Sequence, residues 1–173
     1  RALVLALTRT ATVLFAGGGM YNSQGKLIEG LLAVDPITGQ LLNWLPQVDH
    51  LVWSLGIGKN TLFAGGAFSK VGTSTRTALA AFDATTGVLK NWAPSMPTNA
   101  VVFSVAADGD TLYAGGMFYN AAGKYRPGLA VFPPVGTPRI SIQPRGTRVV
   151  PDESVNLTVE ATGAAPLSYQ WRL

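Results

Sequence analysis

The sequence has 173 residues, of which 47% are apolar and 13% charged, with 20 Gly, 11 Pro and no Cys. An average soluble domain is about 25% charged, so this composition argues against helices with charged outer faces and favours short strands joined by tight turns. The net charge of +4 is scattered, which argues against nucleic acid as a partner. The lack of Cys excludes disulfides and thiolate metal sites within this chain.

The first predicted element is a strand at residues 3–7. This apolar segment could belong to a signal peptide, but similar segments recur at residues 51–55 and 101–105, which indicates a repeated strand. No apolar run reaches the ~18 residues that a membrane-spanning helix needs, so no membrane insertion is expected. Because the chain begins with Arg1 rather than Met, we expect it to be an internal piece of a longer protein.

A motif of a leucine, an aromatic residue, an alanine and two glycines occurs three times. Its glycine pairs are Gly17 and Gly18, Gly65 and Gly66, and Gly115 and Gly116. The motif therefore advances by 48 and then by 50 residues. At the first of these offsets Asp35 matches Asp83, and Trp44 matches Trp92. We infer three repeats, at residues 1–48, 49–98 and 99–132.

Each complete repeat is predicted to hold four short antiparallel strands. In the second repeat these are residues 51–55, 61–68, 78–82 and a segment around Trp92 that ends at Pro94. The glycine pair lets neighbouring backbones approach closely, and Asp83 begins a tight turn by accepting backbone N–H bonds. No segment shows the apolar spacing of a helix. Four short strands with a period near 50 residues describe the blade of a β-propeller.

The third repeat stops one strand short. Pro133 stands where Asp35 and Asp83 stand in the other repeats, and both the turn and the tryptophan strand are missing. Three blades cannot close a ring, since four to eight are typical of propellers. We therefore expect further blades, and the strand that completes the last one, upstream of Arg1.

The tail is predicted to be a linker followed by the start of a sandwich. Residues 133–138 hold three prolines and form a stiff linker. Within residues 139–173, a strand is expected at 140–143, and the alternation over 154–160 places every second apolar side chain on one face. This part resembles the N-terminal portion of bacterial immunoglobulin-like domains. The resemblance implies that Trp171 is the buried tryptophan of the third strand in that fold.

Four short patterns carry a family resemblance in the repeats. They are Leu-Tyr-Ala-Gly-Gly-x-Phe, Arg-x-x-Leu-Ala-x-Phe-Asp, Thr-Gly and Asn-Trp-x-Pro. Together they resemble the bacterial delta-sixty repeats, which are kelch-like blades of large secreted and surface proteins. The resemblance covers residues 1–132 and is fullest in the second repeat, whereas Ile28 replaces the arginine in the first.

The expected fold is all-β. It combines a partial β-propeller of three four-stranded antiparallel blades, the last without its fourth strand, with the start of an immunoglobulin-like β-sandwich. The family resemblance implies a bacterial protein that is extracellular or lies at the cell surface.

The repeat also predicts which residues have structural roles. These are the three glycine pairs, Trp44, Trp92, Asp35, Asp83 and Trp171. Arg76 and Arg126 precede the third strand at equivalent positions. They either bind an anionic or sugar ligand or tie blades together through carbonyl or carboxylate contacts, and the structural role is favoured. Trp53 could join the other tryptophans in a sugar platform, but regular blade positions favour packing between blades.

No catalytic residue, metal or cofactor is expected. His50 is the single histidine and is interpreted as an exposed loop residue rather than a catalytic base. Asp108 and Asp110 flank a glycine, and we interpret them as a hairpin turn because the further oxygen ligands of a calcium loop are missing.

The leading hypothesis for function is a non-catalytic scaffold, adhesion or ligand-binding module whose partner is a protein or a glycan. One alternative is a structural subunit of an extracellular fibre, which self-assembles through incomplete sheet edges. The other is an accessory domain of a larger secreted enzyme. Fold class alone does not decide between these functions.

Overall fold

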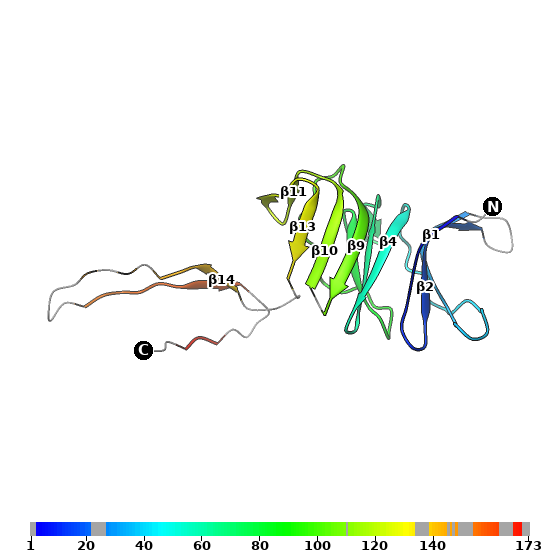
Figure 1. Ribbon diagram of the computed structural model, residues 1–173, viewed down its shortest axis with the longest axis horizontal. Helices are drawn as coiled ribbons and strands as arrows, with labels where there is room; N and C mark the ends of the chain where they lie inside the picture. Colours follow the sequence, from blue (N-terminus) through cyan, green and yellow to red (C-terminus); the bar gives the residue numbers. More distant parts are fainter. Residues whose placement is uncertain are drawn as a thin grey trace. The chain divides into compact units, whose positions relative to one another are not determined.

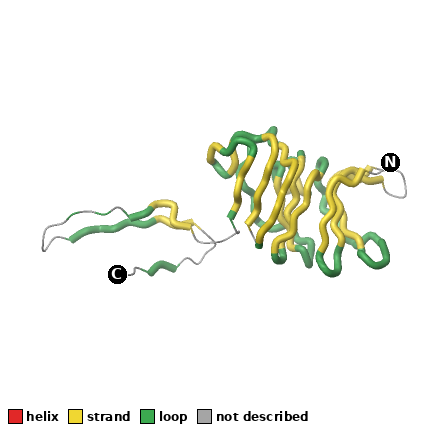
Figure 2. Tube along the Cα trace, in the orientation of Figure 1, coloured by secondary structure: helices red, strands yellow, loops and turns green. Residues whose placement is uncertain are grey.

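The computed structural model describes residues 3–21, 27–109, 111–133, 139–144, 146, 148, 154–162 and 168–170. Within these ranges the chain consists of strands, turns and loops without a helix, which confirms the predicted all-β class (Figure 2). Among the described residues, accordingly, no helix could cross a bilayer. The chain divides into two compact units, Arg1–Phe132 and Pro133–Leu173.

The first unit holds three three-stranded antiparallel sheets, one in each repeat (Figure 1). The first sheet consists of β1 (Leu3–Arg9), β2 (Leu14–Tyr21) and β3 (Leu27–Val34). The second consists of β4 (Val52–Gly58), β5 (Thr61–Gly66) and β8 (Leu79–Asp83). The third consists of β9 (Val101–Asp108), β10 (Thr111–Met117) and β13 (Leu129–Phe132). The strand with the glycine pair is the central one in each sheet, and none of the three sheets is closed.

A small two-stranded hairpin separates the second and third strands in the later two repeats. These hairpins are β6 (Lys70–Val71) with β7 (Ser74–Thr75), and β11 (Asn120–Ala121) with β12 (Lys124–Tyr125). Each hairpin is tied to the end of the preceding repeat. The Gly72 N–H donates to the Gln47 carbonyl (2.7 Å), and the Ala122 N–H donates to the Ser95 carbonyl (2.8 Å).

The predicted fourth strand of the first two repeats is reduced to a single bridge, so four-stranded blades are corrected to three-stranded sheets. The bridges join Leu41 to Val34 and Leu89 to Phe82. The chain then turns away from the sheet, because the Trp44 N–H donates to the Leu42 carbonyl (2.7 Å) in a three-residue turn. Trp92 and Lys90 make the same turn (2.8 Å). A proline two residues after each tryptophan has no N–H with which to continue a ladder.

The three sheets pack face to face in chain order. We call the side that packs on the next sheet the trailing face and the opposite side the leading face. In the second sheet, Phe63, Gly65, Leu79 and Ala81 share the trailing face, and Val52, Leu55, Leu62 and Ala64 share the leading face. The first strands of successive sheets, β1, β4 and β9, contact one another in that order. Two hydrophobic clusters fill the spaces between the sheets.

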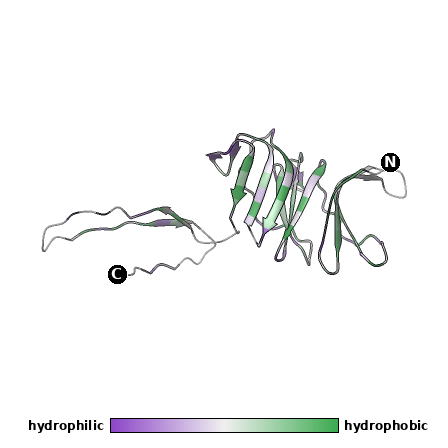
Figure 3. Ribbon diagram, in the orientation of Figure 1, coloured by the Kyte–Doolittle hydropathy of each residue, from purple (hydrophilic) through white to green (hydrophobic). Residues whose placement is uncertain are grey.

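The third strands of the second and third sheets are apolar on both faces. Residues 79–82 read Leu-Ala-Ala-Phe, and residues 129–132 read Leu-Ala-Val-Phe, which gives β13 its hydrophobic colour in Figure 3. A strand that lacks polar alternation is typical of a sheet that is covered on both sides. In β8 this holds, since residues 79–82 are all buried.

A β-bulge lies at the same position in the first strand of every sheet, opposite the glycine pair. The register shifts occur between Val4 and Ala6 in β1, between Val52 and Ser54 in β4, and between Val102 and Ser104 in β9. The residue left out of register is Leu5, Trp53 or Phe103. A bulge re-aims the side chain of the extra residue, so each repeat turns one apolar side chain out of the regular ladder.

The second unit contains one two-stranded antiparallel sheet in its described residues, β14 (Arg139–Ile142) with β15 (Glu160–Thr162). The strand predicted over 154–160 begins only at its last residue, and Val155 and Leu157 are exposed. An alternating pattern forms a strand only where a partner supplies the ladder bonds and a covering face, and the described residues supply neither at 154–159. Trp171 and most of the predicted linker, residues 134–138, lie outside the described residues.

Candidate functional site

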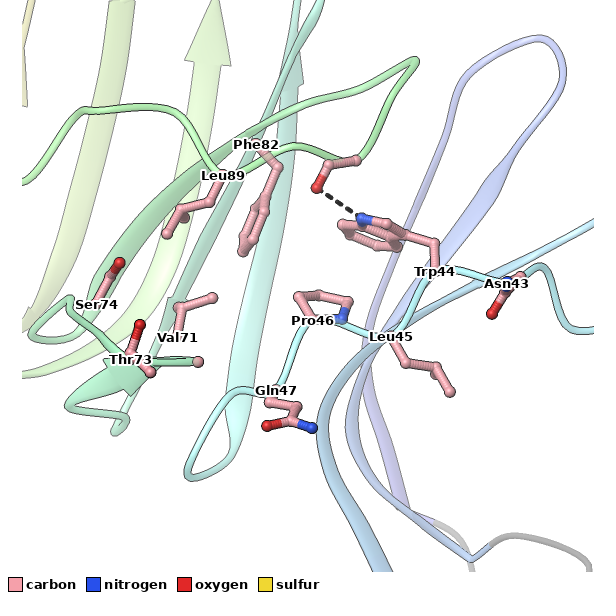
Figure 4. Close-up of a pocket in the computed structure, with 12 residues that line it drawn as sticks. Asn43, Trp44, Leu45, Pro46, Gln47, Val71, Thr73, Ser74, Phe82 and Leu89 are labelled. Atoms are coloured by element: carbon pink, nitrogen blue, oxygen red, sulfur yellow. Dashed lines mark hydrogen bonds between the residues drawn. The ribbon is translucent and has the colours of Figure 1, made fainter.

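Trp44 joins the first sheet to the second. Its ring meets Phe15 and Phe82 edge to face, with centroid distances of 5.3 and 5.5 Å. Its indole N–H donates to the Gly87 carbonyl at 2.7 Å (Figure 4). This turn requires glycine at position 87 for two reasons. Gly87 has a φ of +73°, which other residues rarely adopt, and a Cβ there would collide with the indole ring. Trp44 is therefore engaged in packing on both sides of its ring.

Trp92 makes the same join between the second and third sheets. Its ring lies 5.5 Å from Phe63 and 5.6 Å from Phe132, again edge to face. Edge-to-face aromatic pairs contribute about 0.5–1.5 kcal/mol each beyond the burial of their area. These contacts place both tryptophans between sheets, at the positions where packing between blades was predicted.

The glycine pairs of the first two sheets lie in equivalent environments. A Cβ on Gly17 would come within 2.7 Å of Val52 Cγ1, and one on Gly65 would come within 2.6 Å of Val102 Cγ1. The first glycine of each of these pairs thus receives a valine from the next sheet. The second glycine of every pair lies against the backbone of its own bulged first strand. Gly115 differs, because the atom nearest to a Cβ at this position is the Gly128 carbonyl oxygen, 3.9 Å away.

Arg76 and Arg126 have different surroundings. The Arg76 guanidinium is half-buried and donates to the carbonyls of Thr75 (2.8 Å) and Lys90 (3.2 Å). Its buried Nε has no hydrogen-bond partner among the described residues. Arg126 is exposed, and the third repeat ends before a segment equivalent to the one around Lys90. The contacts of Arg76 with two backbone carbonyls are those of the structural alternative.

Asp35 and Asp83 each hold a turn. The Asp35 carboxylate accepts the N–H groups of Ile37 and Thr38, both at 2.8 Å, and Asp83 accepts the N–H of Thr86 at 2.8 Å. These backbone hydrogen bonds, from Thr38 above all for Asp35 and from Thr86 for Asp83, lower the pKa of each carboxyl below its usual value. Both carboxylates therefore have local partners in their own turns.

Asp49 ties the start of the second repeat to its hairpin. Its carboxylate accepts the Ser69 hydroxyl (2.6 Å), the Ser69 N–H (2.8 Å) and the Lys70 N–H (2.9 Å). Partial burial raises the pKa of Asp49, but these hydrogen bonds outweigh it, and the pKa lies below its usual value. No sequence pattern pointed to this residue, because the third repeat has Asn99 at the equivalent position.

Asp49 is expected to make stability fall in acid. Because its pKa is lower in the folded state, its stabilisation is present above the unfolded-state value of about 3.9 and is lost as pH falls through the folded value. Asp49→Asn should therefore flatten the dependence of unfolding free energy on pH between about pH 5 and 2. Urea unfolding of both proteins across this range measures the effect. Equal slopes for variant and parent would contradict it.

An open groove of about 580 Å³ lies between the end of the first repeat and the β6–β7 hairpin (Figure 4). Its polar lining consists of Asn43, Gln47, Thr73 and Ser74, and its apolar lining consists of Trp44, Leu45, Pro46, Val71, Phe82 and Leu89. Gly72 and Gly87 complete the lining, which includes no charged residue. The bridge between Val48 and Val71 and the contacts of Asp49 hold the two walls together.

The bulges produce an exposed aromatic pair apart from the packed tryptophans. Trp53 and Phe103 meet edge to face at 5.8 Å, and both are exposed. They come from the neighbouring first strands β4 and β9. Trp53 is therefore unlike Trp44 and Trp92, although packing between blades was predicted for all three.

The remaining candidates do not assemble into a site. His50 is exposed, and its Nδ1 accepts the N–H of Leu51 (2.8 Å). Among the described residues, no group of three or more His, Asp or Glu side chains lies close enough together to hold a metal ion. Asp110 lies outside the described residues, and Asp108 ends β9.

Comparison with known proteins gives little. No family model and no curated protein matches the chain. Among solved structures, the computationally designed Ika4 protein is similar with a TM-score of 0.33 and 15% identity, over 76% of this chain and 91% of that chain. The computationally designed Ika8 protein has a TM-score of 0.30 and 14% identity, over 72% of this chain and 47% of that chain. Scores this low support no conclusion about this chain.

Proposed function

We propose that this chain is a non-catalytic ligand-binding and adhesion module of a secreted or cell-surface bacterial protein. Its three sheets are blades of a delta-sixty, kelch-like β-propeller, and its second unit is the start of an immunoglobulin-like domain. The repeated packing supports the blades, because Trp44 and Trp92 join successive sheets in the same way. The groove beside Trp44 is the ligand site.

The groove carries this proposal. Its volume of about 580 Å³ lies within the range of about 300–1,000 Å³ that is usual for ligand sites. Amide and hydroxyl side chains line it together with apolar ones, and no lining residue is charged. Such a surface matches a neutral glycan, whose hydroxyl groups both donate and accept hydrogen bonds while its C–H faces lie on apolar side chains. An anionic ligand would find no cation there.

The test is a binding screen of the full chain against immobilised neutral and acidic glycans, followed by titration of the best one. Gln47→Ala and Ser74→Ala each remove one hydrogen-bonding side chain. Each should weaken binding about 2- to 10-fold, which corresponds to the net value of one hydrogen bond. Circular dichroism of each variant checks that the fold is retained.

Trp53→Ala is the matched control, because Trp53 is exposed but is not among the lining residues of the groove. It should leave glycan affinity unchanged. If Trp53→Ala abolishes binding while the groove variants bind normally, the site lies at the exposed aromatic pair instead. If the chain binds no glycan but captures a protein through the groove, the ligand class is wrong.

A further inference from the structure

The groove beside Trp44 has two walls that come from different repeats. One wall is the segment 43–47 at the end of the first repeat, and the other is the β6–β7 hairpin, which supplies Thr73 and Ser74 (Figure 4). The hydrogen bond from the Gly72 N–H to the carbonyl of residue 47 holds the two walls together at 2.7 Å. Because the walls are fixed within the first unit, the groove exists before a ligand enters it.

The polar side chains of the groove are free to bind a ligand. In the part of the chain that the structure describes, none of them makes a hydrogen bond to another residue. A hydroxyl in the nearby turn differs, since Thr86 donates to the Asp83 carboxylate at 3.0 Å. Each amide and each hydroxyl in the groove can both donate and accept. The four side chains are Asn43, Gln47, Thr73 and Ser74.

The first wall presents its side chains in alternation. Asn43, Leu45 and Gln47 are exposed, whereas Trp44 and Pro46 between them are half-buried. Alternation of this kind is typical of extended backbone, and the residue before a proline is restricted to extended conformations. The exposed side of this wall therefore carries an amide, an apolar side chain and a second amide in a row.

The two amides of this wall are too far apart for one sugar ring to contact both. From Asn43 to Gln47 an extended chain advances by about 12 Å, at ~3.1 Å per residue. A pyranose ring with its linking oxygen spans roughly 5 Å, because its single bonds are about 1.5 Å long. A glycan chain therefore needs two or three consecutive units to reach from one amide to the other.

We infer that the groove binds two or three consecutive units of a neutral glycan chain rather than a single sugar, with Asn43 and Gln47 as its two end contacts. Leu45 lies between the amides, where the C–H face of a sugar ring packs on it. The hydroxyls of Thr73 and Ser74 bind the chain from the opposite wall. This inference rests on the proposed function of the groove and adds the length of the ligand.

The join between the second and third repeats has different chemistry at these positions. Asn91 matches Asn43, but Ser95 stands where Gln47 does and has no amide. On the hairpin of the third repeat, Lys124 replaces one of the two hydroxyl residues, so a cation faces the position of a neutral group. The neutral site is therefore expected at the first join, and Asn91 provides a matched control for it.

Calorimetric titration of the full chain with unbranched neutral oligosaccharides of one to six hexose units tests the length. The linkage is the one that binds best in the glycan screen. Affinity should rise at least about 5-fold from one unit to three, because the contact with the second amide is added, and should change little beyond three. A steady rise up to six units would overturn the count of units.

This series also separates the inference from the proposed function. Equal affinity for one unit and for three units overturns the inference, while glycan binding in the groove stands. A chain that binds no neutral glycan of any length overturns the proposed function, and the inference with it.

Asn43→Ala and Gln47→Ala test the two end contacts. For the three-unit ligand, each should weaken binding about 2- to 10-fold. The double variant should multiply the two losses, since sites more than about 7–10 Å apart act independently. A single hexose reaches one end only, so its affinity should fall in at most one of the two single variants. Losses in both variants for the single hexose would overturn the separation of the ends.

Asn91→Ala is the control, because it removes the same side chain from the same place in the next repeat, and Asn91 is not among the lining residues of the groove. It should leave the affinity for the three-unit ligand unchanged. A loss equal to that of Asn43→Ala would overturn the assignment of the site to the first join. Circular dichroism of each variant checks that the fold is retained.

Discussion

Replacing Trp92 by alanine is expected to lower the free energy of unfolding by about 3 kcal/mol. The loss has two parts. Deleting the ring leaves a space between the second and third sheets that neighbouring side chains fill incompletely. It also removes two edge-to-face contacts, with Phe63 at 5.5 Å and Phe132 at 5.6 Å. Urea unfolding of the full chain, followed by circular dichroism, measures the change.

Trp53→Ala is the matched control for this prediction, because it removes the same side chain from an exposed position. Surface substitutions away from special features usually change stability by about 0.5 kcal/mol or less, and the one exposed contact with Phe103 adds little to this. The two alanine variants should therefore differ by at least ~2 kcal/mol. Similar losses would mean that the position of Trp92 between the sheets contributes nothing special to stability.

The strands, the glycine pairs and the aspartate turns could be predicted from the sequence because each depends on local chemistry that is repeated. Asp83 accepts backbone N–H groups two and three residues ahead, wherever the rest of the chain lies. Gly65 stands in a motif that occurs three times, so its structural role was visible before its contact with Val102 was known. The structural role of a residue that recurs at the same place in each repeat can therefore be predicted from the sequence.

The fourth strand could not be excluded from the sequence, because its failure depends on packing between repeats. Trp44 leaves the sheet through a three-residue turn and inserts its ring between Phe15 and Phe82, which lie in different sheets. The alternation of apolar and polar residues within one segment does not predict that a side chain of that segment will insert between two sheets. The groove was missed for the same reason, since Gln47 and Ser74 line one groove only after the two repeats pack.

The bulges explain why the tryptophans were grouped wrongly. Trp53 falls at a regular position in its repeat, as Trp44 and Trp92 do. Regularity in the sequence does not separate a ring held between sheets from one that a bulge turns outward. A comparison across repeats partly separates the two kinds of tryptophan. The positions equivalent to Trp53 are Leu5 and Phe103, so tryptophan is not kept there. Trp44 and Trp92, in contrast, are each followed by a proline after one residue.

Gly65→Ala is expected to cost about 2 kcal/mol of unfolding free energy, through overpacking rather than through backbone strain. Its φ is not in the left-handed region, so alanine fits the strand locally. The new Cβ, however, would lie 2.6 Å from Val102 Cγ1 and 2.9 Å from Val105 Cγ1. Both valines are buried and, being β-branched, have little freedom at χ1. The sheets must therefore separate locally. Urea unfolding measures the loss.

Gly115→Ala is the decisive comparison, because it makes the same change at the same place in the motif. The nearest atom to a Cβ on Gly115 is 3.9 Å away, so the substitution costs no packing within the chain. Replacing a strand glycine by alanine should instead stabilise the folded chain by about 0.5 kcal/mol. A loss of unfolding free energy as large as that of Gly65→Ala would contradict this explanation, because the two positions differ in the space around the added Cβ.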